Sequence, residues 1–530
     1  MAPAPMTSEG LPFIVSTSTK KPDPEMRKFI RSHVMIGKNL GKILRPRRSK
    51  AGESSSSEES HDSRLRSSRE KEGYDDDDDE LITLTPVVVP RRVGGDFSFI
   101  RFADTIEDSS IAVILEFSSI AKKALFPLES CIAFAAREKA GWMEALTVDA
   151  AYLHALAFST RAYFDLMPNG CTPSTSTGHP ASASYRHMLK TLRLLRERLD
   201  APPPTEHDAA GAAVEKASFS TAAVVLCLAF HAHMTGERET ARHHLLGLRK
   251  IVDLKGGLAG LGNVKLVIEL LRCDMAMALH NGTQPLFFAD PIREPYWAYP
   301  DFSLYDIPCD PGDEDEPVLA TTTWNAELAR AWRAMKQFCT LVNRAAAAGT
   351  KLPEQTLLAA MAAVTYRLLH MRRARGAPPE AEEAVRVGLL AFCSGVFLQW
   401  ASVRLPYTHF PRVYRATVVD LALSVPAPTP IPILGTDHHP YGSSPDTASS
   451  LPRLLVWLLT IGAVSLFGAA DTEGWLKPLL RVNLERCGVR SWPAMRAVLD
   501  SFMWIGIVHD APGKALFDSV MSPSLYLQAV

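Results

Sequence analysis

Apolar residues recur at spacings of three and four positions through most of the chain after about Asp96. This period is that of an amphipathic α-helix, whose buried face returns about every 3.6 residues. Each periodic segment is bounded by Pro, Gly or Ser, which commonly mark the ends of helices. The pattern predicts helices over residues 108–122, 124–139, 147–166, 184–198, 218–234, 237–254, 264–279, 324–347, 355–374, 379–402 and 410–423, with further helices after Leu451.

The chain is therefore expected to be all-α, as a large irregular helical array with a disordered N-terminal arm. No period repeats along the sequence, so a regular solenoid is not expected. Three polar insertions, which begin at Pro168, Tyr305 and Pro426, are expected to form surface loops between helices.

The first 95 residues differ from the remainder. Residues 1–50 are expected to contain a short amphipathic helix, with Asp23 as N-cap and Pro24 at its first position, followed by a basic segment. Residues 51–95 are a linker rich in Ser and acidic residues, which includes the run YDDDDDE and has little to bury; we expect it to be disordered. Residues 96–530 form the helical domain.

The basic segment carries the one dense cluster of cations in the sequence: Lys42, Arg45, Arg47, Arg48 and Lys50. Such a cluster serves as a nuclear-import signal, contacts nucleic-acid phosphates, or is a solvated tail. We favour import, because phosphate contacts without a base-reading element give only nonspecific, salt-sensitive affinity. Acidic residues follow a serine run that offers candidate phosphorylation sites at Ser54, Ser55, Ser56 and Ser57.

The composition limits the classes of partner that we expect for this chain. The net charge is -1, so no global field draws the chain to nucleic acid or to an anionic membrane. The eight cysteines contain no Cys-x-x-Cys pair, which argues against a zinc cluster and a disulfide framework. No secretory signal is visible at the start. The apolar run Leu454–Ala470 is interpreted as a buried core helix rather than a membrane span, and no membrane association is expected.

The stretch ARHHLLGLRKIVDLKGGLAGL, residues 241–261, raises the question of a metal site or a phosphate loop. On a helix, His243 and His244 diverge and do not easily share a metal. Gly256 and Gly257 follow a helix rather than a strand, which indicates a left-handed helix end and not a phosphate-binding loop. The stretch is thus predicted to be a helix, a stop and a second helix with Asn263 as N-cap.

The sequence shows no nucleophile, base and orienting group that form a catalytic set. We therefore expect that the protein is not an enzyme and that it binds neither a cofactor nor a metal. The tryptophans at helical positions are interpreted as core anchors: Trp142, Trp457, Trp475, Trp492 and Trp504.

The same stretch resembles the pattern A-x-x-H-x-x-G-L-x-x-hydrophobic-V-x-L-x-G-G of the fungal-specific transcription factor domain family. Four further segments are also similar to that family: ESCIAFAAREKAGWMEALTVDAAYLHALAFSTRAYFD, LRCDMAMALHNGTQPLFF, LPRLLVWLLTIGAVS and RSWPAMRAVLDSFMWIGIVHDAPGKALFDSV. Together they span most of residues 96–530. The family is the all-α regulatory domain of Zn2Cys6-type factors, and this chain resembles the subgroup that lacks the zinc cluster, because no cysteine precedes Cys131.

The resemblance implies a nuclear transcriptional regulator of a fungal cell that acts through its helical domain. Its partners would be proteins, either a second copy or other transcription factors, and its contact with DNA would be indirect. The alternative is a helical protein-interaction adaptor with no direct chromatin role.

Overall fold

The computed structural model divides the chain into two units, Met1–Pro90 and Arg91–Val530. It describes residues 100–118, 126–134, 141–166, 180–201, 218–305, 325–371, 380–398, 405–424 and 445–522, all of which belong to the second unit. The predicted N-terminal helix, basic segment and disordered linker therefore lie outside the described residues.

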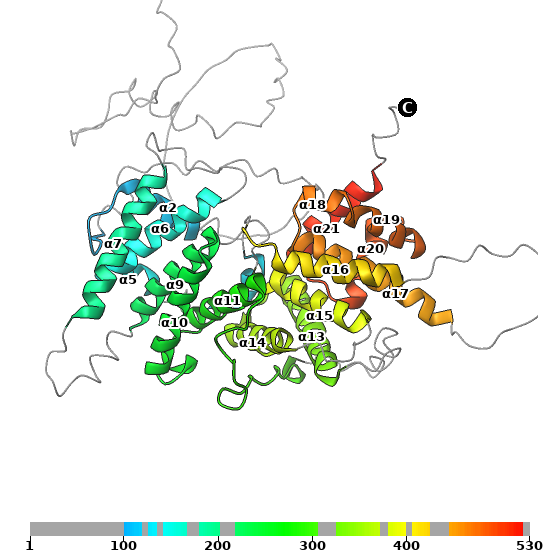
Figure 1. The fold of residues 1–530 in the computed structure, drawn as a ribbon, viewed down its shortest axis with the longest axis horizontal. Helices are drawn as coiled ribbons and strands as arrows, with labels where there is room; N and C mark the ends of the chain where they lie inside the picture. The colour runs from blue at the N-terminus through cyan, green and yellow to red at the C-terminus, as the bar shows by residue number, and fades with distance from the viewer. Residues whose placement is uncertain are drawn as a thin grey trace, which may run out of the picture. The chain divides into compact units, whose positions relative to one another are not determined.

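Helices make up most of the described chain (Figure 1). In the first half they are α2 (Asp108–Glu116), η3 (Pro127–Cys131), α5 (Gly141–Val148), α6 (Ala150–Leu166), α7 (Pro180–Asp200), α9 (Phe219–Thr235), α10 (Arg238–Leu254), η5 (Leu258–Leu261), α11 (Val264–Asn281) and η6 (Ser303–Tyr305). In the second half they are α13 (Ala326–Ala348), α14 (Glu354–His370), α15 (Glu380–Cys393), η8 (Ser394–Leu398), α16 (His409–Ser424), α17 (Pro445–Ser465), α18 (Ala469–Glu473), α19 (Leu476–Arg486), α20 (Trp492–Phe502) and α21 (Gly506–Met521). The expected all-α fold is confirmed for these residues.

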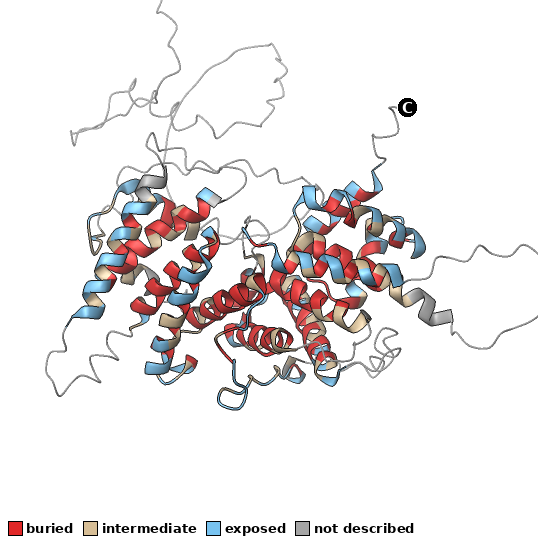
Figure 2. Cartoon of the chain, in the orientation of Figure 1, coloured by how far each residue is buried: buried red, intermediate tan, exposed pale blue. Residues whose placement is uncertain are grey.

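Helices that follow one another in the chain mostly pack together, as short connections favour. Helix α6 packs on α2, α5, α7 and α9, and α9 packs on α10 and α11. Helix α17 packs on α15, α16, α19, α20 and α21. Helix α11 joins these two groups, because it contacts α9 and α10 on one side and α14 and α16 on the other. From Leu266 to His280 every side chain of α11 except Glu269 is buried, and most of this helix has the colour of buried residues in Figure 2.

Local signals place the helix ends. Several helices begin at an N-cap whose side-chain oxygen accepts a backbone N–H of the first turn: Ser218, Asn263, Asn325 and Ser491. Helices α9, α11 and α13 end at glycines with a left-handed backbone, namely Gly236, Gly282 and Gly349. These ends follow from a few neighbouring residues, which explains why the sequence predicted them within a few positions.

The predicted helix over 124–139 is wrong in its described part. Residues 127–131 form the short 3-10 helix η3, and Ile132–Ala133 form strand β1, which pairs in parallel with strand β2 (Leu352–Pro353). The partner strand lies more than two hundred residues away. A contact at that distance along the chain leaves no trace in local periodicity, whereas the apolar residues of this segment are equally suited to a helix face.

Two of the predicted insertions are shorter than expected. Helix α7 begins at Pro180, inside the insertion from Pro168, and α17 begins at Pro445, inside the insertion from Pro426. Proline fits the first turn of a helix because its missing N–H has no intrahelical partner there. The predicted helix over 379–402 is also interrupted, since α15 gives way to the π-helical turn η8.

The apolar run Leu454–Ala470 supplies the buried part of α17. Residues 454–462 are all buried, and the indole N–H of Trp457 donates to the Met503 carbonyl at 2.9 Å. The buried-core interpretation is therefore confirmed. Among the described residues, no helix combines the length and hydropathy that crossing a membrane requires.

Candidate functional site

The stretch 241–261 forms helix α10, its stop and the short helix η5. The predicted apolar stripe of α10 is buried, at Ala241, Leu245, Leu248 and Val252. Gly256 and Gly257 both have positive φ, and the Gly257 N–H donates to the Val252 carbonyl at 2.9 Å. This is the left-handed helix end that the sequence predicted. His243 is exposed and His244 is half-buried.

The helices on either side of this stretch carry a buried histidine pair that sequence spacing did not reveal. His233 on α9 and His280 on α11 are buried, with Nε2 of the first and Nδ1 of the second 3.1 Å apart. Tyr407 stacks on both rings and its hydroxyl donates to the His233 carbonyl at 2.7 Å. Burial lowers the pKa of His233 to about 3 and that of His280 to about 4, so both rings are neutral near neutral pH.

A buried carboxylate organises the turn after α11. Asp274 accepts hydrogen bonds from the backbone N–H groups of Leu286 and Phe287, at 2.8 and 3.1 Å, and from the hydroxyl of Tyr366 at 2.9 Å. Burial raises the pKa of Asp274 to about 6, although the three donors favour its ionised form. The Asp of the quoted segment LRCDMAMALHNGTQPLFF thus fixes the turn at the end of that segment.

The same turn is held from the other side by an ion pair. The Phe288 N–H donates to Glu294 at 2.8 Å, and Arg249 of α10 pairs with the same carboxylate oxygen at 2.6 Å. Phe288 has a φ of 56°, a left-handed conformation that is strained for an aromatic residue. Two carboxylates, Asp274 and Glu294, therefore stabilise a turn that bridges α10, α11 and α14.

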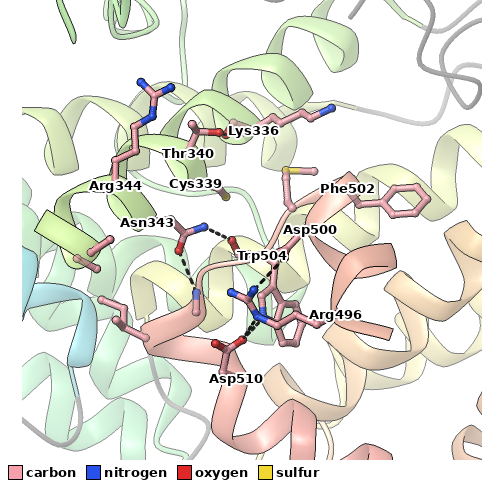
Figure 3. A pocket seen from close by; sticks show the side chains of 15 residues that line it. Lys336, Cys339, Thr340, Asn343, Arg344, Arg496, Asp500, Phe502, Trp504 and Asp510 are labelled. Carbon is pink, nitrogen blue, oxygen red and sulfur yellow. Dashed lines mark hydrogen bonds and ion pairs between the residues drawn. The ribbon is translucent and has the colours of Figure 1, made fainter. Parts of the chain in front are cut away.

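A cavity of about 820 Å³ lies between α13 and the segment α20–α21 (Figure 3). Helix α13 contributes Lys336, Cys339, Thr340, Asn343, Arg344, Ala346 and Ala347; the opposite wall is made of Arg496, Asp500, Phe502, Met503, Trp504, Gly506, Ile507 and Asp510. We call this cavity the α13–α21 groove.

One amide holds the two walls of the groove together. Asn343 donates through Nδ2 to the Trp504 carbonyl at 2.8 Å, and its Oδ1 accepts the Gly506 N–H at 3.0 Å. Asp510 accepts both the Trp504 indole N–H, at 2.6 Å, and the Nε of Arg496, at 2.9 Å. The groove floor is thereby fixed by hydrogen bonds rather than by apolar packing alone.

The electrostatics of the groove suit binding. Its hydrogen bond to Asp510 raises the pKa of Arg496, which keeps that side chain cationic. Burial raises the pKa of the Cys339 thiol well above its usual range, and a protonated thiol is a poor nucleophile. Cations from both walls, carboxylates and exposed apolar surface at Ile507 together offer contacts to a polar ligand or peptide.

The candidate sites named from sequence belong to a part of the chain that the structure does not describe. Outside the described residues lie the basic cluster of Lys42, Arg45, Arg47, Arg48 and Lys50 and the candidate phosphorylation sites Ser54, Ser55, Ser56 and Ser57. Within the described ranges, no group of three or more His, Cys, Asp or Glu is arranged to hold a metal ion. The histidine pair was missed because its members are 47 residues apart and belong to different helices.

The tryptophans whose side chains are described are mostly core residues, as predicted. Trp457, Trp475 and Trp504 are buried, and half-buried Trp492 packs edge-on against Trp504 at a centroid distance of 6.3 Å. Trp142 lies on α5, and its side chain is outside the described part.

No family model, curated protein or solved structure that was compared with the chain matches it. The resemblance to the fungal-specific transcription factor domain is therefore carried by the quoted segments alone.

Proposed function

We propose that the chain is a transcriptional regulator of a fungal cell that acts in the nucleus through its helical regulatory domain, without a zinc-cluster DNA-binding module of its own. The observation that carries this proposal is the resemblance of residues 241–261 and of the segments around it to the fungal-specific transcription factor domain. Protein partners would bring the regulator to its target genes, so its contact with DNA is indirect.

Most apolar positions of the pattern that resembles the family are buried in the fold, as a helical domain of that family would require. Among the apolar members of the pattern, Ala241, Leu248, Ile251 and Val252 are core residues of α10, whereas Leu254 is 53% exposed. Gly247 faces α9, where a Cβ would meet the Val225 side chain at 3.8 Å, an ordinary packing distance.

The second candidate is a helical adaptor that binds proteins away from chromatin. The α13–α21 groove favours it, since a cavity with cations on both walls and carboxylates on one suits a peptide as well as a small ligand. Both candidates use the helical domain for binding, and they differ in whether the protein is found at genes.

Chromatin occupancy separates the two candidates. The full-length chain should be recovered by cross-linking at discrete promoters, while the purified chain should bind duplex DNA only weakly, with an affinity that falls steeply with salt. A deletion of residues 1–50 serves as the matched comparison. Absence of promoter enrichment in cells would reject the regulator and leave the adaptor.

Replacement of Lys42, Arg45, Arg47, Arg48 and Lys50 by glutamine tests the basic cluster. We expect the nuclear fraction of a fluorescent fusion to fall, because import receptors recognise dense positive charge. The control replaces Arg64, Arg66 and Arg69, which are more widely spaced. An unchanged nuclear fraction in the five-residue variant would assign this cluster no part in import.

A further inference from the structure

Two buried imidazole rings meet where helix α7 packs on α6. Nδ1 of His154 on α6 lies 2.8 Å from Nδ1 of His187 on α7, and both residues are buried. A ring nitrogen either donates or accepts, so a contact this short requires one proton between the two nitrogens. We call these two residues the α6–α7 histidine pair.

Each ring of the pair turns its outer nitrogen toward a carboxylate. Nε2 of His154 lies 3.4 Å from Oδ2 of Asp104, and Nε2 of His187 lies 3.2 Å from Oε2 of Glu107. The Ser110 hydroxyl also lies 3.1 Å from Nε2 of His187. Both carboxylates belong to the segment that leads into α2, so the pair connects that segment, α6 and α7.

Cations of α7 stand next to these carboxylates. Lys190 pairs with Asp104 at 2.7 Å, and Arg186 approaches Glu107 at 3.6 Å. Each carboxylate thus pairs with one ring and one cation. The other helices that pack on α6 carry titratable groups with different surroundings: Asp108 of α2 and Glu144 of α5 are exposed, and His231 of α9 packs edge-on against Phe158.

The number of ring protons decides which contacts of the pair can form. Two neutral rings hold one proton between the Nδ1 atoms and one on an outer nitrogen, so the other outer nitrogen turns a lone pair toward a carboxylate. One further proton lets both outer nitrogens donate while the Nδ1 contact is kept. A second further proton puts N–H groups on both Nδ1 atoms, which cannot then stay 2.8 Å apart.

We propose that the α6–α7 histidine pair is a proton-operated latch, which holds one extra proton while α7 is docked on α6 and opens when it receives a second. Burial lowers the pKa of both rings, and the facing carboxylates oppose this effect. In an undocked α7 the rings would meet water and take up protons near the ordinary pKa of about 6.5. Acidification therefore favours the undocked form. This inference does not depend on the proposed role in transcription.

The latch predicts how steeply the docking of α7 depends on pH. The docked pair with its extra proton holds one proton fewer than two imidazolium rings in water. Undocking should therefore become about tenfold more favourable for each pH unit below about pH 6, which is the slope for one proton.

Hydrogen exchange of the full-length chain measures this slope on peptides from α7, after correction for the intrinsic exchange rate at each pH. An undocked helix of this length is only marginally stable in water, so its amides exchange once it leaves α6. The protection of α7 should fall by about tenfold from pH 6 to pH 5.

Asparagine variants remove one ring at a time, because the amide takes the place of Nδ1 and does not titrate. In His187→Asn the remaining ring holds one extra proton whether α7 is docked or undocked, so the protection of α7 should stay the same from pH 6 to pH 5. His154→Asn removes the other ring and should behave in the same way. The matched control is His243→Asn, at an exposed position of α10, which should keep the tenfold fall.

Three results would overturn the latch. Protection of α7 that does not change with pH in the parent chain would show that the pair does not control docking. An equal fall in the parent and in both asparagine variants would place the titrating group elsewhere. A fall of about a hundredfold per pH unit would show that the docked pair holds no extra proton and that opening takes up two.

Discussion

At the scale of single residues, the structure concentrates its unusual chemistry on buried polar groups around α11. His233 and His280 share a hydrogen bond, and Asp274 gathers three donors. Each group ties α11 to another segment: the histidine pair to α9, and Asp274 to the following turn and to α14. Buried polar groups cost free energy unless they are paired, so these contacts favour one arrangement of the helices over its alternatives.

The histidine pair predicts how stability depends on pH. Both folded-state pKa values, about 3 and about 4, lie below the ordinary value of 6.5, so the unfolded chain takes up protons first as the pH falls. Stability is therefore retained above about pH 6.5 and is lost on acidification, by up to about 1.4 kcal/mol per pH unit for each histidine. Urea denaturation between about pH 7 and pH 5 measures this loss.

The variant His280→Asn isolates one of the two groups. It should be less stable than the parent at neutral pH, and the difference in unfolding free energy should shrink by about 1 kcal/mol or more toward pH 5. His243→Asn, at an exposed position of α10, should follow the parent across the range. A difference that stays constant with pH would contradict the expected burial of His280.

At the scale of elements, close approach of helices depends on small residues at particular crossings. A Cβ on Gly388 of α15 would lie 2.4 Å from Leu458 Cδ2 and 2.9 Å from Trp457 Cζ3, both on α17. Both partners are fully buried, so neither can move aside without disturbing its own neighbours. The glycine allows α15 and α17 to pack closely at the centre of the second group of helices.

Gly388→Ala should therefore destabilise the protein. Alanine gains up to about 1 kcal/mol in helix propensity, but overpacking in a rigid core costs about 1–3 kcal/mol and the overlap here is severe. Thermal and urea denaturation measure the net effect. The control is Gly474→Ala, where a Cβ would meet no atom within 4 Å and φ is -80°, so its stability should be equal or slightly higher.

At the scale of the described molecule, one hydrophobic core extends from Ile114 to Val520. Helix α11 belongs to both groups of helices that share this core. Loss of packing on α11 would thus expose both groups at once, which favours unfolding in a single cooperative step despite the length of the chain.

Two spectroscopic probes test this cooperativity. Eight of the nine tryptophans follow residue 296, so tryptophan fluorescence reports mainly on the later helices. Far-ultraviolet circular dichroism reports on the helices of both groups. The two denaturation curves should coincide. Leu271→Ala, at a fully buried position of α11, should lower the unfolding free energy from both curves by the same amount, about 2–5 kcal/mol. Exposed Leu254→Ala should shift neither, and separate transitions would show that the two groups unfold independently.

The amino-acid sequence by itself determined the helical class, most helix positions, the glycine stop after α10 and the buried run of α17. These features depend on spacing and end residues within one segment, so local physics is sufficient to set them. Tertiary structure alone decided the strand at Ile132–Ala133, the meeting of His233 with His280 and the α13–α21 groove, because each joins segments that are distant in the sequence. It also decided which face of α7 is exposed. The period of three and four predicts that helix, but its packing on α6 buries Leu195 and leaves Leu189 and Leu192 exposed.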